Sequence, residues 1–323
     1  MDRPISRGGG LIGALTVAAA VLAAAPATAG EPVNNGAQPL TFALIGDTPY
    51  GAAQEQQFPA LVRDINADPE VRLVLHAGDV KTGSSTCDDA RFARLAGLFG
   101  EFQNPFVLTP GDNEWTDCHR VAAGQYLPTE RLDAVRRVFF PEPGHTLGRQ
   151  PMTVTSQAGD PAHSDYRENV LFERARVVFA TVHVVGSEND LEPWAQLSGG
   201  DRPDLRLAEF AARQAADLDW IDLAFDTAQE RDVAAVLLLM QAEPTATPGF
   251  QAIRDRITAR AVAFGRPVLL VHGDEHIYEV EPNYAGIANL TRLETFGDTA
   301  TQWLRVSIDP RTTDVFNWTT EAL

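Results

Sequence analysis

The chain has 323 residues, of which 44% are hydrophobic, and it carries a formal charge of −18. Its length and hydrophobic content suffice for one large domain or two ordinary ones. The negative charge, with Lys81 as the single lysine, argues against nucleic acid as a partner, because an acidic surface repels phosphate backbones.

The N-terminal segment predicts export. Arg3 and Arg7 precede the apolar run 11–25, and small residues end at Ala29, which is the pattern of a cleaved signal peptide over residues 1–29. A retained membrane anchor is the alternative, but the run is shorter than the roughly 20 residues that a span needs. Cleavage would remove two arginines and one aspartate and change the formal charge from −18 to −19. We therefore expect a secreted or periplasmic protein with no membrane span after cleavage.

Strand-like and helix-like segments alternate after a polar lead-in over residues 30–39. Short apolar runs rich in leucine and β-branched residues predict strands that are buried on both faces. These runs are 41–47, 71–79, 105–112, 176–186, 233–244 and 267–276. Apolar positions at three- and four-residue spacing predict amphipathic helices. The predicted helices are 58–65, 90–99, 129–139, 205–228 and 250–264.

The C-terminal part predicts antiparallel hairpins, because it consists of shorter segments with a more alternating pattern of apolar residues, and turn residues separate these segments. The segments concerned are 278–284, 289–296, 301–309 and 314–319. Alternating strands and helices followed by a β-rich closure predict a layered α/β domain, for which two facing sheets are one arrangement. We expect a single domain over residues 40–323.

Four predicted strands end in an aspartate that follows a glycine. The aspartates are Asp47, Asp79, Asp112 and Asp274. Because ligands of open α/β sheets lie beyond the carboxyl ends of the strands, we expect the four carboxylates to converge. Two carboxylates about 4 Å apart repel by roughly 4 kcal/mol at an effective dielectric of 20, so a cation must lie among them. Arginine or a divalent metal ion would serve. An oxygen-rich set favours Mg²⁺, Mn²⁺ or Ca²⁺, with iron or zinc as alternatives.

Cys87 and Cys118 are the only cysteines of the chain. An even count in an exported chain predicts a disulfide, whereas two free thiols would suit an intracellular protein. The bond would tie the loop after Asp79 to the loop after Asp112. Closing a loop of roughly 30 residues contributes about 3 to 4 kcal/mol of stability in the chain-entropy account.

Four segments at these strand ends, GDTPY, HAGD, PGDNE and HGDEH, resemble in this order the signature of the calcineurin-like metallophosphoesterases. The resemblance covers residues 41–280. It implies an αββα sandwich, with two facing sheets and helices on the outer faces, and a two-metal centre that hydrolyses phosphoesters. The metal ligands that it implies, residue by residue, are Asp47, Asp79, Asp112, Asp274 and His276.

The sequence departs from this signature at positions where the family has histidines. Pro49 stands in place of one histidine ligand, and Asn113 replaces the histidine that protonates the leaving group or steadies the phosphate. The lone histidine of the fourth motif is also missing, and Gln241 or Glu243 is available there. The catalytic candidates are therefore Asn113 and His119, the additional ligand candidate is Gln241, and Tyr50 is a further stand-in.

A bound phosphate also needs positive and polar neighbours besides a metal. Lys81 and Arg120 are placed to supply this positive charge, and an equally weighted alternative is that both are ordinary solvated surface residues. Asn189 is a candidate substrate contact. His76 and His272 lie inside apolar runs, where a hydrogen-bonded strand residue is a more common role than a ligand.

The sequence thus predicts an exported metal-dependent phosphoesterase that acts on a phosphate mono- or diester, either small or attached to a surface. Glu114 is expected to orient a neighbouring ligand. The alternative is a catalytically weak or inactive binding protein on the same fold, which the altered histidine positions favour.

Overall fold

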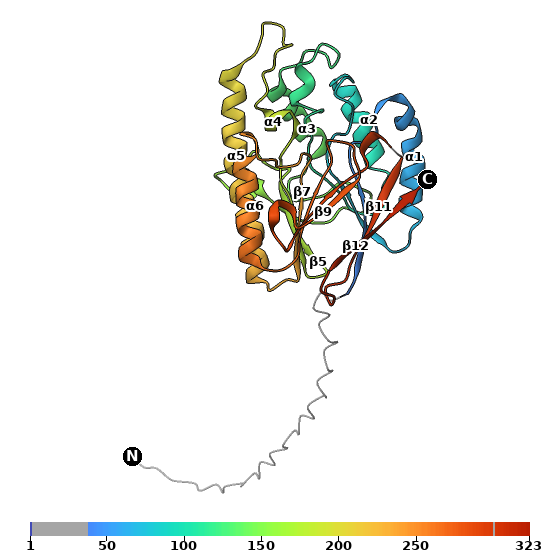
Figure 1. The fold of residues 1–323 in the computed structure, drawn as a ribbon, viewed down its shortest axis with the longest axis vertical. Coiled ribbons are helices and arrows are strands. Elements are labelled where there is room, and N and C mark those ends of the chain that lie inside the picture. The colour runs from blue at the N-terminus through green and yellow to red at the C-terminus, as the bar shows by residue number, and fades with distance from the viewer. Residues whose placement is uncertain (2–37, 300) are drawn as a thin grey trace. The chain divides into compact units, whose positions relative to one another are not determined.

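The computed structural model describes residue 1 and residues 38–299 and 301–323 (Figure 1). The expected signal peptide, apart from its first residue, and all but the last two residues of the lead-in lie outside the described residues. The described residues from 38 onward belong to one compact unit with two β-sheets. Within the described part of the chain, no helix is both long and apolar enough to cross a membrane.

The first sheet has five strands in the order β12-β11-β1-β2-β3. β1 (Leu40–Ile45), β2 (Val71–His76) and β3 (Phe106–Leu108) run parallel to one another. β11 (Gln302–Ile308) pairs antiparallel with β1 and with β12 (Phe316–Ala322). The sheet therefore joins the N-terminal strands to the last hairpin of the chain.

The second sheet has seven strands in the order β4-β5-β6-β7-β8-β10-β9. Its central strands β6, β7, β8 and β10 are parallel, and both edges are antiparallel. The strands are β4 (Thr155–Ser156), β5 (Val170–Arg174), β6 (Val177–Thr181), β7 (Ala235–Leu239), β8 (Val268–His272), β10 (Leu290–Glu294) and β9 (Glu279–Pro282).

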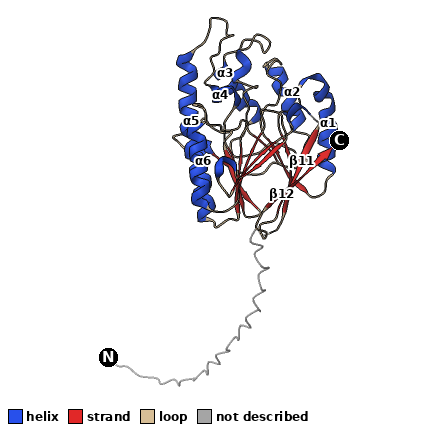
Figure 2. Cartoon of the chain, in the orientation of Figure 1, coloured by secondary structure: helices blue, strands red, loops and turns tan. Residues whose placement is uncertain are grey.

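Longer helices connect the parallel strands and cover the outer faces of the sheets (Figure 2). They are α1 (Gly51–Ala67), α2 (Asp89–Phe99), α3 (Pro128–Phe139), α5 (Pro203–Glu230) and α6 (Gln251–Phe264). Asp88 caps α2, because its side chain accepts a hydrogen bond from the backbone N–H of Arg91 at 2.8 Å. Phe99 of α2 stacks on Phe106 of β3 at a centroid distance of 4.8 Å. Such a pair contributes about 1 kcal/mol beyond its buried area.

The alternation of side chains along each strand separates three hydrophobic cores. Phe42 and Leu44 of β1 lie in the core between the sheets, whereas Ala43 and Ile45 pack in the core shared with α1, α2 and α3. In the second sheet, odd positions of β6 such as Val177 and Phe179 enter the same central core. Its even positions Val178 and Ala180 pack in the core formed with α5 and α6. Helices on one side, two sheets and helices on the other side give the predicted αββα sandwich.

The predicted fold class is confirmed, and two details differ from expectation. The C-terminal segments form the expected hairpins, but the two hairpins belong to different sheets, because β10 pairs parallel with β8 and β11 pairs with β1. β4 and β5 were not predicted.

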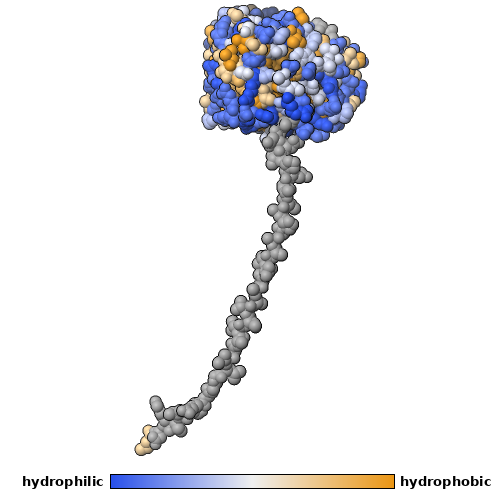
Figure 3. Space-filling view, turned by 60° about the horizontal axis from the view of Figure 1, so that its bottom comes forward, coloured by the Kyte–Doolittle hydropathy of each residue, from blue (hydrophilic) through white to orange (hydrophobic). Residues whose placement is uncertain are grey.

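Hydrophilic residues predominate on the face shown in Figure 3, and hydrophobic residues gather in one part of it.

Candidate metal centre

Four aspartates lie at the carboxyl ends of strands from both sheets. The register of the first sheet pairs Ile45 with His76 and His76 with Leu108, so β1, β2 and β3 end at one level. The loops that follow these strands carry Asp47, Asp79 and Asp112, and the loop after β8 carries Asp274.

The carboxylates converge as the sequence predicts. Asp79, Asp112 and Asp274 each offer an oxygen within 4.8 Å of the oxygens of the other two. Asp47 joins them, because its Oδ1 accepts a hydrogen bond from the backbone N–H of Asp274 at 3.1 Å. All four carboxylates therefore face one site at the joint edge of the two sheets.

Glycines let these carboxylates approach the neighbouring backbone. A Cβ on Gly111 would lie 2.0 Å from Asp79 Oδ1, and a Cβ on Gly273 would lie 2.0 Å from Asp47 Oδ2. Any side chain at either position would displace a carboxylate of the site. At these two positions the glycine of a Gly–Asp pair therefore makes room for the aspartate of another strand.

Asn113 and Tyr50 hold Asp79. The side-chain amide of Asn113 donates to Asp79 Oδ2 at 2.6 Å, and its backbone N–H donates to Asp79 Oδ1 at 3.1 Å. The hydroxyl of Tyr50 also donates to Asp79 Oδ2, at 2.8 Å. Asn113 thus occupies the centre, but its amide serves as a hydrogen-bond donor to a carboxylate.

Gln241 and Ser187 hold Asp112 and Asp274. Gln241 Nε2 donates to Asp274 Oδ1 at 2.7 Å and lies 3.5 Å from Asp112 Oδ1. The backbone N–H of Gly186 donates to Gln241 Oε1 at 2.7 Å, and this fixes which end of the amide faces the carboxylates. The Ser187 hydroxyl donates to Asp112 Oδ2 at 2.8 Å. Gln241 accordingly presents its NH₂ group, rather than its oxygen, to the centre.

Asp47 and His276 form the other side of the site. His276 Nε2 lies 3.4 Å from Asp47 Oδ1, and His276 Nδ1 lies 2.8 Å from Asp298 Oδ1. The hydrogen bond to Asp47 raises the pKa of His276 to about 9. Asp47 Oδ2 is buried and has no hydrogen-bond partner among the described residues. A buried carboxylate oxygen without a donor is where a cation would be expected.

The electrostatics of the site call for positive charge. Burial raises the pKa of Asp274 to about 8, with the charges of Asp112 and Asp47 adding to the shift. Burial also raises the pKa of Asp79 well above its usual value, and the neighbouring carboxylates reinforce it. Two ionised oxygens 4.8 Å apart repel by roughly 3 kcal/mol at an effective dielectric of 20. This set of potential metal ligands, carboxylates and one imidazole, fits a divalent cation such as Mg²⁺, Mn²⁺ or Ca²⁺.

Glu114 and Lys81 lie behind the carboxylates. Glu114 accepts hydrogen bonds from the backbone N–H of Gly111 at 2.7 Å and of Val80 at 3.3 Å, so it joins two of the aspartate-bearing loops. Lys81 is fully buried and donates to the carbonyl of Thr82 at 3.1 Å. Burial lowers the pKa of Lys81 to about 8 although the surrounding acids oppose this. Lys81 is therefore not the solvated surface charge that the sequence left open.

Three predicted site residues form hydrogen bonds or ion pairs with protein groups other than the four aspartates. The ring Nδ1 of His119 accepts a hydrogen bond from the backbone N–H of Gln196 at 3.3 Å. Arg120 is 40% exposed and pairs with Asp117 at 2.5 Å. Asn189 is fully buried, and its side chain binds protein groups on both sides, as described below. The structure thus brings Asn113 to the centre and leaves His119 and Asn189 outside it.

His76 and His272 have the structural role that was expected. His76 Nε2 lies 2.8 Å from the carbonyl oxygen of Thr48, and His76 Nδ1 accepts from the N–H of Gly78 at 3.1 Å. His272 Nδ1 lies 2.7 Å from the carbonyl oxygen of Gly273. Neither histidine belongs to the group of candidate ligands.

The predicted disulfide is confirmed. Cys87 and Cys118 are bonded across a sequence separation of 31. Both are fully buried, and both sulfurs lie 3.8 Å from the carbonyl oxygen of Asn113. The bond therefore fixes the loop after β2 against the loop after β3, where Asn113 holds Asp79.

Sequence reasoning missed the contribution of Gly186, Ser187 and Asp117. A Cβ on Gly186 would lie 2.8 Å from oxygens of both Asp112 and Asp274. Ser187 Oγ lies 3.2 Å from Asp117 Oδ1 as well as 2.8 Å from Asp112. The available signal was that Gly186 follows an apolar strand in the same way as the glycines of the four Gly–Asp pairs.

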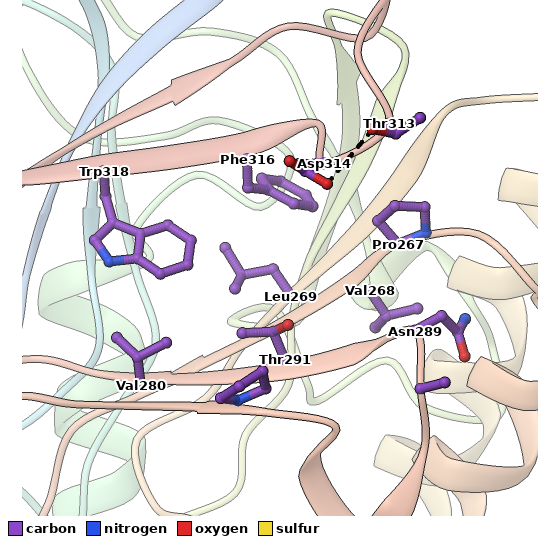
Figure 4. A pocket seen from close by; sticks show the side chains of 12 residues that line it. Pro267, Val268, Leu269, Val280, Asn289, Thr291, Thr313, Asp314, Phe316 and Trp318 are labelled. Carbon is purple, nitrogen blue, oxygen red and sulfur yellow. Dashed lines mark hydrogen bonds between the residues drawn. The ribbon is translucent and has the colours of Figure 1, made fainter.

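A separate cavity of about 420 Å³ lies between β12, the edge strand of the first sheet, and strands β8, β9 and β10 of the second sheet (Figure 4). Phe316 and Trp318 of β12 face Leu269 of β8 and Thr291 of β10 across it. None of the residues that line this cavity belongs to the carboxylate cluster. The candidate centre is therefore distinct from it.

A family model described as calcineurin-like phosphoesterase matches residues 40–278. The chain belongs to the calcineurin-like phosphoesterase family. The match includes the four strand-end aspartates and His276, so the resemblance seen in the sequence is confirmed. A search of curated proteins gave no match.

Three solved structures are similar to the chain at low identity. GAP50, the anchor in the inner membrane complex of Plasmodium, is 10% identical with a TM-score of 0.47, and the match covers 88% of this chain and 89% of that one. Purple acid phosphatase PPD1 from yellow lupin (Lupinus luteus) seeds is 9% identical with a TM-score of 0.49, over 90% of this chain and 55% of that one. Calcineurin-like phosphoesterase YfkN from Bacillus subtilis is 10% identical with a TM-score of 0.42, over 88% and 90%. Because all three TM-scores are below 0.5, the family assignment rests on the family model.

Proposed function

We propose that the protein is an exported, metal-dependent phosphoesterase that hydrolyses a phosphate mono- or diester, either small or attached to a surface. One observation carries this proposal: Asp79, Asp112 and Asp274 offer oxygens within 4.8 Å of one another at the strand ends, where this family has its metal motifs. The unpartnered buried oxygen of Asp47 supports it.

Five side chains would hold a two-metal type of centre, namely Asp47, Asp79, Asp112, Asp274 and His276. Mn²⁺, Mg²⁺ or Ca²⁺ suits this largely oxygen-based set better than iron or zinc. Divalent cations at such a site stabilise the negative charge that develops on a phosphoryl group and favour deprotonation of water.

The other residues of the site orient these ligands. Asn113 and Tyr50 donate to Asp79, and Gln241 donates to Asp274, so each carboxylate is held in one direction before a substrate arrives. Arg120 lies 40% exposed beside Asp117 and can exchange this pair for a substrate phosphate. Lys81, being buried, acts through its charge rather than by contact with the substrate.

A binding protein with weak or no activity is the second candidate, and one observation favours it. Asn113 stands where the family has the histidine that assists the leaving group, and a neutral amide cannot supply a proton. A substrate with a good leaving group needs no such acid. The identity of the leaving group therefore separates the two candidates.

Export is supported by the disulfide, because such bonds persist in oxidising compartments outside the cytoplasm. A secreted or periplasmic enzyme would meet phosphate esters outside the cytoplasm. The strongly acidic composition disfavours nucleic acid as the substrate.

The test is hydrolysis of 4-nitrophenyl phosphate and bis(4-nitrophenyl) phosphate with Mn²⁺, for the wild-type protein and for Asp79→Asn. These substrates have good leaving groups, so a missing general acid does not hide activity. We expect metal-dependent turnover that Asp79→Asn abolishes. Wild-type protein that binds Mn²⁺ and yet hydrolyses neither ester would support the binding protein instead.

A further inference from the structure

The segment that follows β6 has an unusual backbone. Ser187, Glu188 and Asn189 have φ values of 53°, 55° and 55°, and Asp190 has a φ of 66°. All four are non-glycine residues in the left-handed region, which L-amino acids enter only at an energetic cost. This segment, Gly186–Asp190, is called the left-handed turn below. Such a conformation persists only where its surroundings determine it.

Arg213 of α5 holds one end of the left-handed turn in this conformation. Arg213 is fully buried, and its NH1 group donates to Asn189 Oδ1 at 2.5 Å and to the carbonyl oxygen of His183 at 2.9 Å. Its NH2 group donates to the carbonyl oxygen of Asn189 at 3.0 Å. One guanidinium therefore fixes both the side chain and the backbone of Asn189.

Further contacts fix the rest of the left-handed turn. Asn189 Nδ2 donates to the carbonyl oxygen of Gly249 at 3.0 Å, and the N–H of Gly249 donates to Glu188 Oε1 at 2.9 Å. Asp190 Oδ1 accepts from Thr116 Oγ1 at 2.5 Å and from Trp194 Nε1 at 2.8 Å. These contacts connect the turn to the loop that carries Asp112.

The left-handed turn presents one donor to the carboxylate cluster directly and a second one through Gln241. The N–H of Gly186 binds Gln241 Oε1 at 2.7 Å, and so directs the NH₂ group of Gln241 to Asp274. The hydroxyl of Ser187 donates to Asp112 Oδ2 at 2.8 Å. A right-handed helical backbone at Ser187 would direct this hydroxyl elsewhere.

We propose that Ser187 is a positioning residue that orients Asp112 for cation binding, and that the left-handed turn held by Arg213 exists to present it. This inference rests on the proposed metal centre. The hydroxyl of Ser187 can orient Asp112 because one carboxylate oxygen of Asp112 faces Gln241 and the other accepts the hydrogen bond from Ser187. The two contacts together hold the carboxylate in one orientation. Loss of a group that orients a ligand lowers metal affinity about 10- to 100-fold.

The test compares Mn²⁺ binding by calorimetry for the full chain and for Ser187→Ala and Ser187→Gly. Alanine keeps the backbone restricted and removes only the hydroxyl, whereas glycine also relieves the left-handed backbone. Ser307→Ala is the control, because Ser307 is far along the chain on β11 and its exposed hydroxyl donates to the carbonyl oxygen of Asn317 at 3.4 Å. Thermal unfolding without metal is measured in parallel.

We expect both Ser187 variants to raise the Kd for Mn²⁺ about tenfold or more while the control leaves it unchanged. Ser187→Gly is expected to do so without a loss of thermal stability, since it removes backbone strain. A lower melting temperature with an unchanged Kd in both variants would assign Ser187 a merely structural role and overturn the inference. Wild-type protein that binds no Mn²⁺ would instead overturn the metal centre itself.

Discussion

Asn113 binds both carboxylate oxygens of Asp79, with its side-chain amide at 2.6 Å from Oδ2 and its backbone N–H at 3.1 Å from Oδ1. Asn113, at the position where the family resemblance implies a catalytic histidine, thus holds the candidate metal ligand Asp79. An amide at this position supplies no proton, but it fixes the orientation of the Asp79 carboxylate.

Replacing Asn113 with alanine is expected to weaken the centre through Asp79. The carboxylate would lose its shortest donor, and we expect Mn²⁺ affinity and turnover to fall about 10- to 100-fold. Calorimetry and hydrolysis of an aryl phosphate measure the two effects. Asn317→Ala on the exposed strand β12 is the matched control and should change neither. Unchanged Mn²⁺ affinity in Asn113→Ala would show that Asp79 needs no clamp.

Two glycine-to-alanine substitutions should have opposite effects. In Gly273→Ala the new Cβ would meet Asp47 Oδ2 at 2.0 Å, so we expect loss of metal binding and lower stability. In Gly97→Ala the new Cβ meets no described residue within 4 Å, and Gly97 lies inside α2. Alanine is favoured over glycine in a helix by about 0.5 to 1 kcal/mol, so this variant should be more stable. Urea unfolding of both variants is the measurement, and a destabilised Gly97→Ala would contradict the packing described for α2.

Removal of the disulfide should destabilise the protein. Cys87 and Cys118 close a loop with a separation of 31 residues, for which the chain-entropy account gives about 3 to 4 kcal/mol. We expect the double variant Cys87→Ala/Cys118→Ala to lose roughly this free energy of unfolding. Mn²⁺ affinity should fall with it, because the bond fixes the loop that carries Asn113. Reductant should lower the melting temperature of the wild type only, and an equal effect on the double variant would point to another cause.

Buried Glu168 predicts a dependence of stability on pH that is separate from the metal centre. Burial opposes its ionisation, but Arg136 and His183 outweigh burial and lower the pKa of Glu168 to about 2. Glu168 pairs with Arg136 at 2.6 Å and lies 2.8 Å from His183 Nδ1. Since the folded pKa is below the unfolded value, the stabilisation is complete above pH of about 4.5 and is lost as the pH falls toward about 2.

Glu168→Gln measures this contribution. At neutral pH we expect a loss of about 3 kcal/mol of unfolding free energy, and at a pH of about 3.5 the difference from the wild type should shrink by about 1 kcal/mol. Urea unfolding at both pH values gives the comparison, in which the carboxylates of the metal centre cancel because both proteins contain them. Glu101→Gln, from the exposed pair with Arg149, is the control and should shift stability by less than about 0.5 kcal/mol. A difference that does not depend on pH would contradict the lowered pKa of Glu168.

The strand-end aspartates could be predicted because their signal is local. An apolar run followed by glycine and aspartate marks the end of a buried strand, and the topology of parallel strands then brings Asp47, Asp79 and Asp112 to one edge. The same argument applies to Asp274, and the structure shows that its carboxylate joins the site from the second sheet.

The orientation of individual side chains could not be predicted in the same way. His119 ends the 3₁₀ helix η1 (Thr116–His119), and its ring meets the loop at Gln196, 77 residues later in the chain. The direction of Ser187 depends on a left-handed backbone that Arg213 stabilises from α5. Contacts of this kind join segments that have no local pattern in common, so composition and spacing do not reveal them.

The central claim is that the four aspartates hold a divalent cation, and direct calorimetric titration of the metal-depleted protein with Mn²⁺ tests it. We expect saturable binding in the wild type that weakens at least tenfold in Asp79→Asn, with the far-ultraviolet spectrum of the variant unchanged. Wild-type protein that binds none of Mn²⁺, Mg²⁺ and Ca²⁺, or an Asp79→Asn variant that binds as tightly as the wild type, would contradict the claim.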